Sequence, residues 1–209
     1  MNTTILSNET WGDAIYLPEN KIEPTIHEKA TIRNSQITGN AIISENVHIV
    51  NAAIRADEGT PFFIGKGSNI QYFCVLHGYV VREKDAEIHT NLIFVDDTYY
   101  SIYIGERVTI AHGALVHGPS YIGDNSFIGF KSTIDAAVIG NNVEIGAHSY
   151  IKRVSIPDNV AILPNAVITK EEDIEKYIVD TTGINTTIVN VNLEMAKAYR
   201  LKYRKSYKV

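Results

Sequence analysis

Cysteine is nearly absent from this chain of 209 residues, because Cys74 is the only one. A disulfide within the chain is therefore impossible, and a zinc site built from several thiolates is excluded. An apolar run of secretory length is also missing from the N-terminal segment, Met1 to Glu19, which carries three acidic residues. We therefore expect a cytoplasmic protein that does not act at a membrane.

An excess of positive charge is also lacking, since 19 basic residues stand against 24 acidic ones and the net charge is -5. This balance gives no electrostatic reason to expect a nucleic-acid partner. The segment from Lys197 to Lys208 is locally basic, and we interpret it as a solvated helix face. The apolar content of 44% is that of an ordinary globular protein, and we expect a single domain over residues 1–209.

The chain does contain a period of six residues. Aliphatic residues recur at this step in several runs, and the longest run slips once by one residue before it resumes. These residues are Ile37, Ile43, Ile49, then Ile64, Ile70, Leu76, then Ile104, Ile110, Val116, Ile122, Ile128, Ile134, and finally Ile139, Ile145 and Ile151. No amphipathic helix has this period.

A period of six suits a chain in which each strand and turn forms one side of a triangular prism, so that 18 residues complete a coil. Glycine and asparagine in pairs such as Asn141-Asn142 can adopt the positive φ values of tight corners. The sequence therefore predicts a mainly β protein, a parallel β-helix of hexapeptide repeats with a C-terminal α-helix packed alongside. Similarity to hexapeptide-repeat proteins implies that the β-helix is left-handed.

Three regions follow from where the period holds. Residues 1–20 are expected to form an N-terminal arm, residues 21–169 the β-helix, and residues 170–209 the C-terminal helices. A charged stretch at about 79–101 does not keep the step and is interpreted as an inserted loop. A short helix is predicted from Glu171 to Val179. A second is predicted from near Asn192, with an apolar stripe through Leu193, Ala196, Tyr199 and Tyr203.

Two histidines share one phase of the repeat. His77 and His117 each follow an inward residue directly, and the 40 residues between them equal one coil of 18 plus 22, close to the length of the inserted loop. If the loop is extruded, the two histidines stack on neighbouring coils about 4.8 Å apart. Two stacked imidazoles can then bind one metal ion, for which zinc to nitrogen distances are about 2.0–2.1 Å.

His112 does not fit the same site within one chain. It precedes His117 by five residues, which along an extended side is roughly 16 Å, and an odd offset turns the two side chains to opposite faces. We therefore expect His112 of a neighbouring chain to complete the site across a threefold axis. The other four histidines, His27, His48, His89 and His148, are interpreted as surface or turn residues.

Several blocks of the chain resemble the γ-class carbonic anhydrases. They are Arg55-Ala56-Asp57-Glu58-Gly59, Ser68-Asn69-Ile70-Gln71, Val75-Leu76-His77, Ala111 to Pro119, and Val189 to Leu193. The resemblance implies a homotrimer that hydrates CO2 reversibly to bicarbonate with a metal-bound hydroxide at each subunit interface. It implies a zinc ion held by His77, His117 and a neighbour's His112, although imidazole ligands also suit cobalt and ferrous iron.

The resemblance also implies roles for residues around the metal. Gln71 and Glu58 match residues that hydrogen-bond the metal-bound water, and Asn190 matches an asparagine that lines the substrate pocket. Arg55 and Asp57 match a charged pair near the interface, and Asn69 lies in the same matched block as Gln71.

The chain departs from the family at two positions. Val80 stands where the best-known active members carry a glutamate that shuttles protons, and Glu83 or Glu87 of the inserted loop could substitute. Tyr72 stands where the family commonly has an aspartate that pairs with the arginine matched to Arg55.

Two other functions compete with CO2 hydration. A hexapeptide-repeat acyltransferase would need one histidine as general base and would bind acyl-CoA between coils. A non-catalytic assembly module would bind metal without hydrating CO2, and the valine at the shuttle position favours it.

Overall fold

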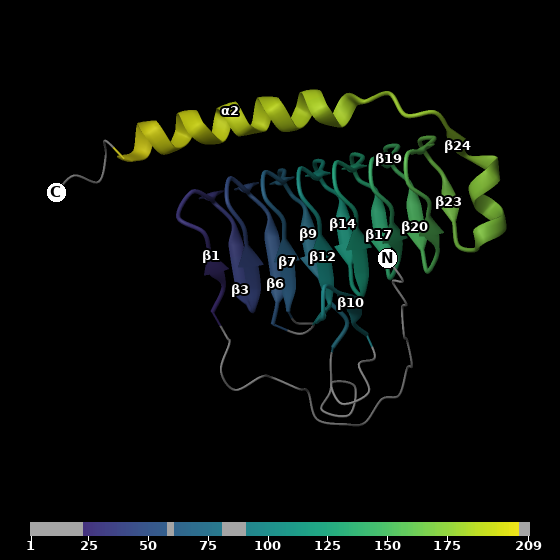
Figure 1. Ribbon diagram of the computed structural model, residues 1–209, viewed down its shortest axis with the longest axis horizontal. Coiled ribbons are helices and arrows are strands. Elements are labelled where there is room, and N and C mark those ends of the chain that lie inside the picture. Colours follow the sequence, from purple (N-terminus) through teal and green to yellow (C-terminus); the bar gives the residue numbers. More distant parts are fainter. Residues whose placement is uncertain (1–22, 58–60, 81–90, 205–209) are drawn as a thin grey trace.

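The computed structural model describes residues 23–57, 61–80 and 91–204. Three sheets form the walls of a solenoid in which the strands stack coil upon coil (Figure 1). Within each sheet, parallel neighbours are one coil apart in the chain. The predicted parallel β-helix of hexapeptide repeats is confirmed. The expected N-terminal arm at residues 1–20 lies outside the described residues.

Each wall takes one strand from each coil. The first wall contains β1 (Thr25–Ile26), β4 (Ala41–Ile43), β7 (Phe62–Ile64), β12 (Ile102–Ile104), β15 (Ser120–Ile122), β18 (Val138–Ile139) and β21 (Ser155–Ile156). The second contains β2 (Thr31–Arg33), β5 (His48–Val50), β8 (Asn69–Ile70), β13 (Thr109–Ile110), β16 (Phe127–Ile128), β19 (Glu144–Ile145), β22 (Ala161–Ile162) and the antiparallel β24 (Ile178–Val179). The third contains β3 (Gln36–Gly39), β6 (Ala53–Ala56), β9 (Val75–His77), β14 (Leu115–His117), β17 (Thr133–Asp135), β20 (Tyr150–Lys152) and β23 (Val167–Ile168).

The repeat residues fill the interior of the solenoid. Ile49, Ile110 and Ile128 are fully buried, as are most of the aliphatic residues that keep the six-residue step. Ile37, in the second coil, is only partly buried. A column of aliphatic side chains, one from each wall of each coil, therefore forms one continuous core, whose burial stabilises the fold by roughly 1.5–3 kcal/mol for each side chain.

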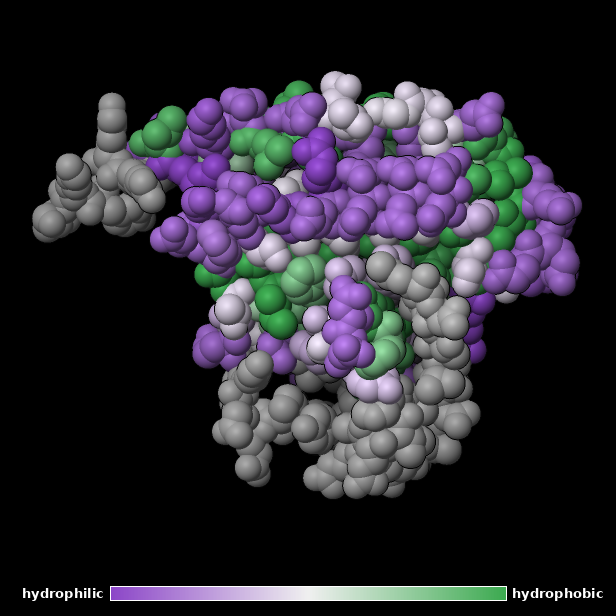
Figure 2. Space-filling view, viewed as in Figure 1, coloured by the Kyte–Doolittle hydropathy of each residue, from purple (hydrophilic) through white to green (hydrophobic). Residues whose placement is uncertain are grey.

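The one-residue slip falls on a corner. Between β17 and β18 the chain turns at Ala136, whose φ is +51°, and the register then resumes with Tyr121 opposite Val138. Other corners place asparagine at positive φ, as at Asn125 and Asn142. Figure 2 shows a hydrophilic band along the long axis of the solenoid below helix α2. Neighbouring corners also bond to one another, since the Asn142 amide donates to Asn159 at 2.9 Å.

The segment at 79–101 does interrupt the repeat, but part of it is regular. Strands β10 (Ile93–Val95) and β11 (Thr98–Tyr100) form an antiparallel hairpin, so the expectation of a plain loop is wrong there. Ile93 and Val95 pack with Tyr121 of the first wall, and these apolar contacts hold the hairpin against the solenoid. Residues 81–90 of this segment lie outside the described residues.

The C-terminal segment differs from the prediction in its boundaries. The predicted short helix is a 3₁₀ helix, η1 (Glu171–Lys176), followed by strand β24. The long helix α2 (Ile184–Arg204) begins well before Asn192 and lies along the second wall (Figure 1). Its first turn is capped from a distant coil, because the buried Glu144 carboxylate accepts a hydrogen bond from the Ile184 amide at 3.0 Å. No signal next to Ile184 in the sequence announces that cap.

Helix α2 packs through one stripe. Val189 and Ala196 are fully buried, Leu193 and Tyr199 are partly buried, and the side chain of Tyr203 lies outside the described part. Among the described helices, none is both long and apolar enough to span a membrane.

Candidate metal centre

A column of polar side chains runs across the third wall, with one residue from each coil. Arg55 pairs in register with His77, His77 with His117, His117 with Asp135, and Asp135 with Lys152. Each follows a buried repeat residue, so all five belong to the outer face of the sheet. The structure confirms the phase argument that stacks His77 on His117 in spite of the 40 residues between them.

The two histidines lie within reach of one ion. Nδ1 of His77 is 3.2 Å from Nε2 of His117, and the ring planes are inclined by 62°. Nδ1 of His117 lies 3.0 Å from the Gly118 carbonyl oxygen and donates a hydrogen bond to it. That bond leaves the lone pair on Nε2, directed toward His77. Burial, with a smaller effect of His77, lowers the pKa of His117, so its neutral form is favoured. Neutral imidazole is the form that binds a metal, and the pair therefore fits one.

An aspartate network that the sequence analysis missed supports His117. Tyr79 packs against the His117 ring with its own ring centre 4.4 Å away, and its hydroxyl donates to Asp135 at 3.2 Å. The Lys152 ammonium pairs with the same carboxylate at 3.1 Å, and Nδ1 of His117 is 4.0 Å from it. Burial and the Asp135 carboxylate raise the pKa of Tyr79. Asp135 follows His117 by 18 residues, so the coil length could have revealed it.

His112 lies on a corner, apart from the histidine pair. It follows β13, is exposed, and lies in a row of rings from consecutive coils, with Tyr72 edge-on at 5.7 Å and Phe130 stacked at 5.6 Å. The premise of a straight extended side between His112 and His117 is wrong, because the chain turns between them. Over residues 23–57, 61–80 and 91–204, no three histidine, cysteine or acidic side chains gather closely enough to hold a metal ion.

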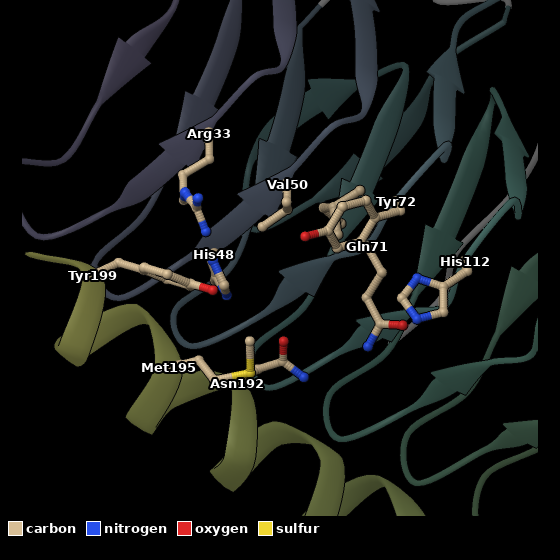
Figure 3. Close-up of a pocket in the computed structure, with 10 residues that line it drawn as sticks. Arg33, His48, Val50, Gln71, Tyr72, His112, Asn192, Met195 and Tyr199 are labelled. Carbon is tan, nitrogen blue, oxygen red and sulfur yellow. The ribbon is translucent and has the colours of Figure 1, made fainter.

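A short hydrogen-bonded chain orients Gln71. The Thr109 hydroxyl accepts a hydrogen bond from the Asn69 amide at 2.9 Å, and Asn69 Oδ1 accepts one from Gln71 Nε2 at 3.1 Å. Asn69 is buried, whereas Gln71 is half-buried and reaches toward His112 (Figure 3). With its nitrogen engaged, Gln71 presents its amide oxygen as a hydrogen-bond acceptor.

The predicted charged pair forms within one chain. The Arg55 guanidinium donates to both Asp57 oxygens, with Nε to Oδ1 at 2.9 Å and Nη2 to Oδ2 at 3.0 Å. This forked contact lowers the pKa of Asp57 and keeps the carboxylate charged. Tyr72, in place of the family aspartate, does not prevent Arg55 from being paired.

A cavity of about 340 Å³ lies between the second wall and helix α2, and it reaches Gln71 and His112 (Figure 3). Asn192 and Met195 line it from the helix. Asn190, the predicted pocket asparagine, is not among its lining residues and accepts a hydrogen bond from Arg107 at 3.3 Å. Two residues turn a helix by about 200°, so Asn190 and Asn192 occupy opposite sides of α2.

His48 also lines this cavity, which corrects its interpretation as a surface or turn residue. It belongs to strand β5 and is 2% exposed. His27 and His148 are exposed, and His89 lies outside the described residues.

Comparison with known proteins identifies the family. The pattern of bacterial transferase hexapeptide proteins (six repeats) matches residues 101–136. Carbonic anhydrase from Methanosarcina thermophila is 34% identical over 173 residues, which are 79% of this chain and 70% of that protein. This chain belongs to the γ-carbonic anhydrase-like family of hexapeptide-repeat proteins.

Other members of this γ-carbonic anhydrase-like family are not named as enzymes. Carboxysome assembly protein CcmM from Nostoc sp. is 38% identical over 156 residues, 74% of this chain. The chain spans only 27% of that longer protein. Among solved structures, a hexapeptide transferase family protein from Anaplasma phagocytophilum shares the fold with a TM-score of 0.62 at 19% identity, over 85% of this chain and 93% of that one.

Within the family comparison, four predicted positions bear on catalysis from the edge of the site. Val80 is half-buried and three residues from His77. Glu58, expected to bond the metal-bound water, lies outside the described residues, as do Glu83 and Glu87, the candidate proton shuttles.

Proposed function

We propose that this protein catalyses the reversible hydration of CO2 to bicarbonate at a site shared between subunits. His77 and His117 of one subunit and His112 of the next would hold the metal. The observation that carries the proposal is the register pair His77 and His117, with ring nitrogens 3.2 Å apart and the Nε2 lone pair of His117 directed at its partner.

Three neutral imidazoles suit zinc, cobalt or ferrous iron. When bound, such an ion would supply a Lewis acid that activates water for attack on CO2. Gln71, with its nitrogen held by Asn69, would accept a hydrogen bond from that water and orient it. Arg55, one coil from His77 and held by Asp57, would add positive charge that favours the anionic product. We assign Glu58 to the same group of water-binding residues.

A homotrimer would bring His112 to its partners. Support comes from the apolar surface around that residue, since Phe73 is 71% exposed and Tyr72, Val75 and Phe130 are also exposed. Aromatic side chains left in water on one edge of a solenoid are typical of a surface that another subunit covers.

The first test measures hydration and metal on the same samples. Protein purified without oxygen is assayed by stopped-flow CO2 hydration, and its metal content is determined. We expect about one ion per chain, and we expect His77→Ala or His112→Ala to lose both metal and hydration. His148→Asn is the control, because His148 is exposed near the same row of corners at a positive φ of 60° that asparagine tolerates.

The second test addresses sharing between subunits. When His77→Ala and His112→Ala chains are refolded together in equal amounts, about a quarter of the interfaces of a random trimer combine an intact pair with an intact corner. Hydration should return to about a quarter of the wild-type rate, although each variant alone is inactive. No recovery in mixed trimers, or full activity in a monomer, would contradict the shared site.

A second candidate function is a non-catalytic assembly module. The observations that favour it are the similarity to CcmM over 74% of the chain and the valine at position 80. This function predicts bound metal with no hydration above the buffer rate, even at high imidazole concentration.

A further inference from the structure

The end of the cavity away from His112 has its own chemistry. Arg33 and His48 line it from the second wall, and Asn192 and Tyr199 line it from helix α2 (Figure 3). This end is built within one protomer, so its composition does not depend on the proposed trimer or on a metal.

His48 is a buried polar group without a hydrogen-bond partner. Neither ring nitrogen makes a hydrogen bond with the described residues, although both are shielded from water. The Asn192 amide is close enough to influence the ring, but its geometry does not bond either nitrogen. Buried imidazoles nearly always have a partner, because an unpaired donor forfeits its hydrogen bond to water. An imidazole that lines a cavity in this state is ready to bond a ligand.

The charges around His48 are positive. The Arg33 guanidinium lies over the Tyr199 ring at 3.8 Å from its centre, and Arg200 is fixed nearby by a hydrogen bond from Nη1 to the Lys29 carbonyl. After burial, which is the main cause, these two guanidinium groups further lower the pKa of His48 to about 4. None of the residues that line the cavity is acidic. The charge of this end is therefore not neutralised by any lining carboxylate, which favours an anion.

The remaining walls restrict which anion fits. Val50, Ile70 and Met195 are apolar, so a doubly charged ion would lose much of its hydration against them. A planar anion with two oxygens offers one to the Arg33 fork and the other to a His48 ring nitrogen. We propose that the Arg33 and His48 end of the cavity binds one small planar monoanion of the carboxylate type, a class that includes formate, acetate and bicarbonate.

Histidine side-chain NMR of the full-length protein as purified tests the proposal. Formate, acetate and bicarbonate are added separately at constant ionic strength, with sodium phosphate as the comparison. We expect the His48 ring signals to shift and saturate with each monoanion, and to shift much less with phosphate. The absence of saturation up to about 0.1 M, well above weak millimolar binding, would overturn the proposal. A stronger response to phosphate than to the monoanions would do so too.

Variants assign the binding to the two side chains. His48→Leu and Arg33→Gln should each weaken acetate binding by at least about tenfold, because a charge-assisted hydrogen bond is lost. His148→Asn should leave it unchanged. Arg33 is only partly buried, so its variant tests the subsite even if His48→Leu does not fold. Wild-type affinity in Arg33→Gln would overturn the proposal. Because every measurement is of anion binding, loss of CO2 hydration in other variants would not affect the result.

Discussion

His48 makes the stability of this protein depend on pH in a predictable direction. Its pKa is about 4 in the folded protein, against an ordinary value of 6.5, because burial and the Arg33 charge disfavour the protonated ring. Between these values the unfolded chain binds a proton that the folded chain does not bind. The contribution of neutral His48 to stability is therefore complete above pH 6.5, falls as the pH decreases, and levels off below about pH 4.

The size of the effect follows from the interval between the two pKa values. Each pH unit in that interval corresponds to ~1.4 kcal/mol, so wild type should lose at most about 3 kcal/mol through His48 between pH 6.5 and pH 4. Because carboxylates also titrate in this range, the informative quantity is the difference between wild type and His48→Leu at each pH. That difference should move in favour of the leucine variant as the pH falls.

Urea unfolding followed by circular dichroism measures this difference at pH 7.5, 6.5, 5.5 and 4.5. The buffers must contain no carboxylate, since acetate is a proposed ligand of the same cavity. His27→Leu serves as the control, because His27 is exposed. If the difference in unfolding free energy between wild type and His48→Leu stays constant over this range, His48 titrates alike in both states and the reasoning is refuted.

Two further predictions concern the coils and the metal pair. Gly65→Ala should destabilise the solenoid by about 2–4 kcal/mol in urea unfolding, because a Cβ would lie 2.4 Å from the Gly105 carbonyl oxygen of the next coil. Gly183→Ala, at positive φ but with open space around it, should cost only about 1 kcal/mol, and equal losses would contradict the steric explanation. Asp135→Asn should lower cobalt affinity by about 10–100-fold in a competition titration, because the tyrosine and lysine around the bound histidine lose their common carboxylate. Unchanged affinity would show that Asp135 does not support the pair.

The sequence predicted the walls of this fold because a repeat carries its own register. Once Leu76 and Val116 are assigned to the interior, the residues that follow them must stack. The start of helix α2 was not predictable in this way. Its first turn is rich in β-branched residues, and its cap, Glu144, comes from a coil 40 residues earlier. The hairpin at β10 and β11 was hidden for a similar reason, because its apolar face packs on tyrosines of another coil.

The site was predictable in proportion to its dependence on register. The stacking of the two histidines followed from counting, and the same count reaches Asp135, although it was not applied there. Corners obey no such count, so the place of His112 needed the structure. The buried state of His48 could not be foreseen either, because a helix from the far end of the chain covers it.

The insertion at 79–101 leaves the sheet only two residues after His77 and returns just before Ile102 resumes the wall. Since the pairing of His77 with His117 is held by hydrogen bonds between coils, the length and composition of that excursion can vary without changing the distance between the two rings. Access to the rings and the chemistry performed by them are thus encoded in separate stretches of the chain. Selection or design can alter the covering segment while the donor atoms keep their spacing.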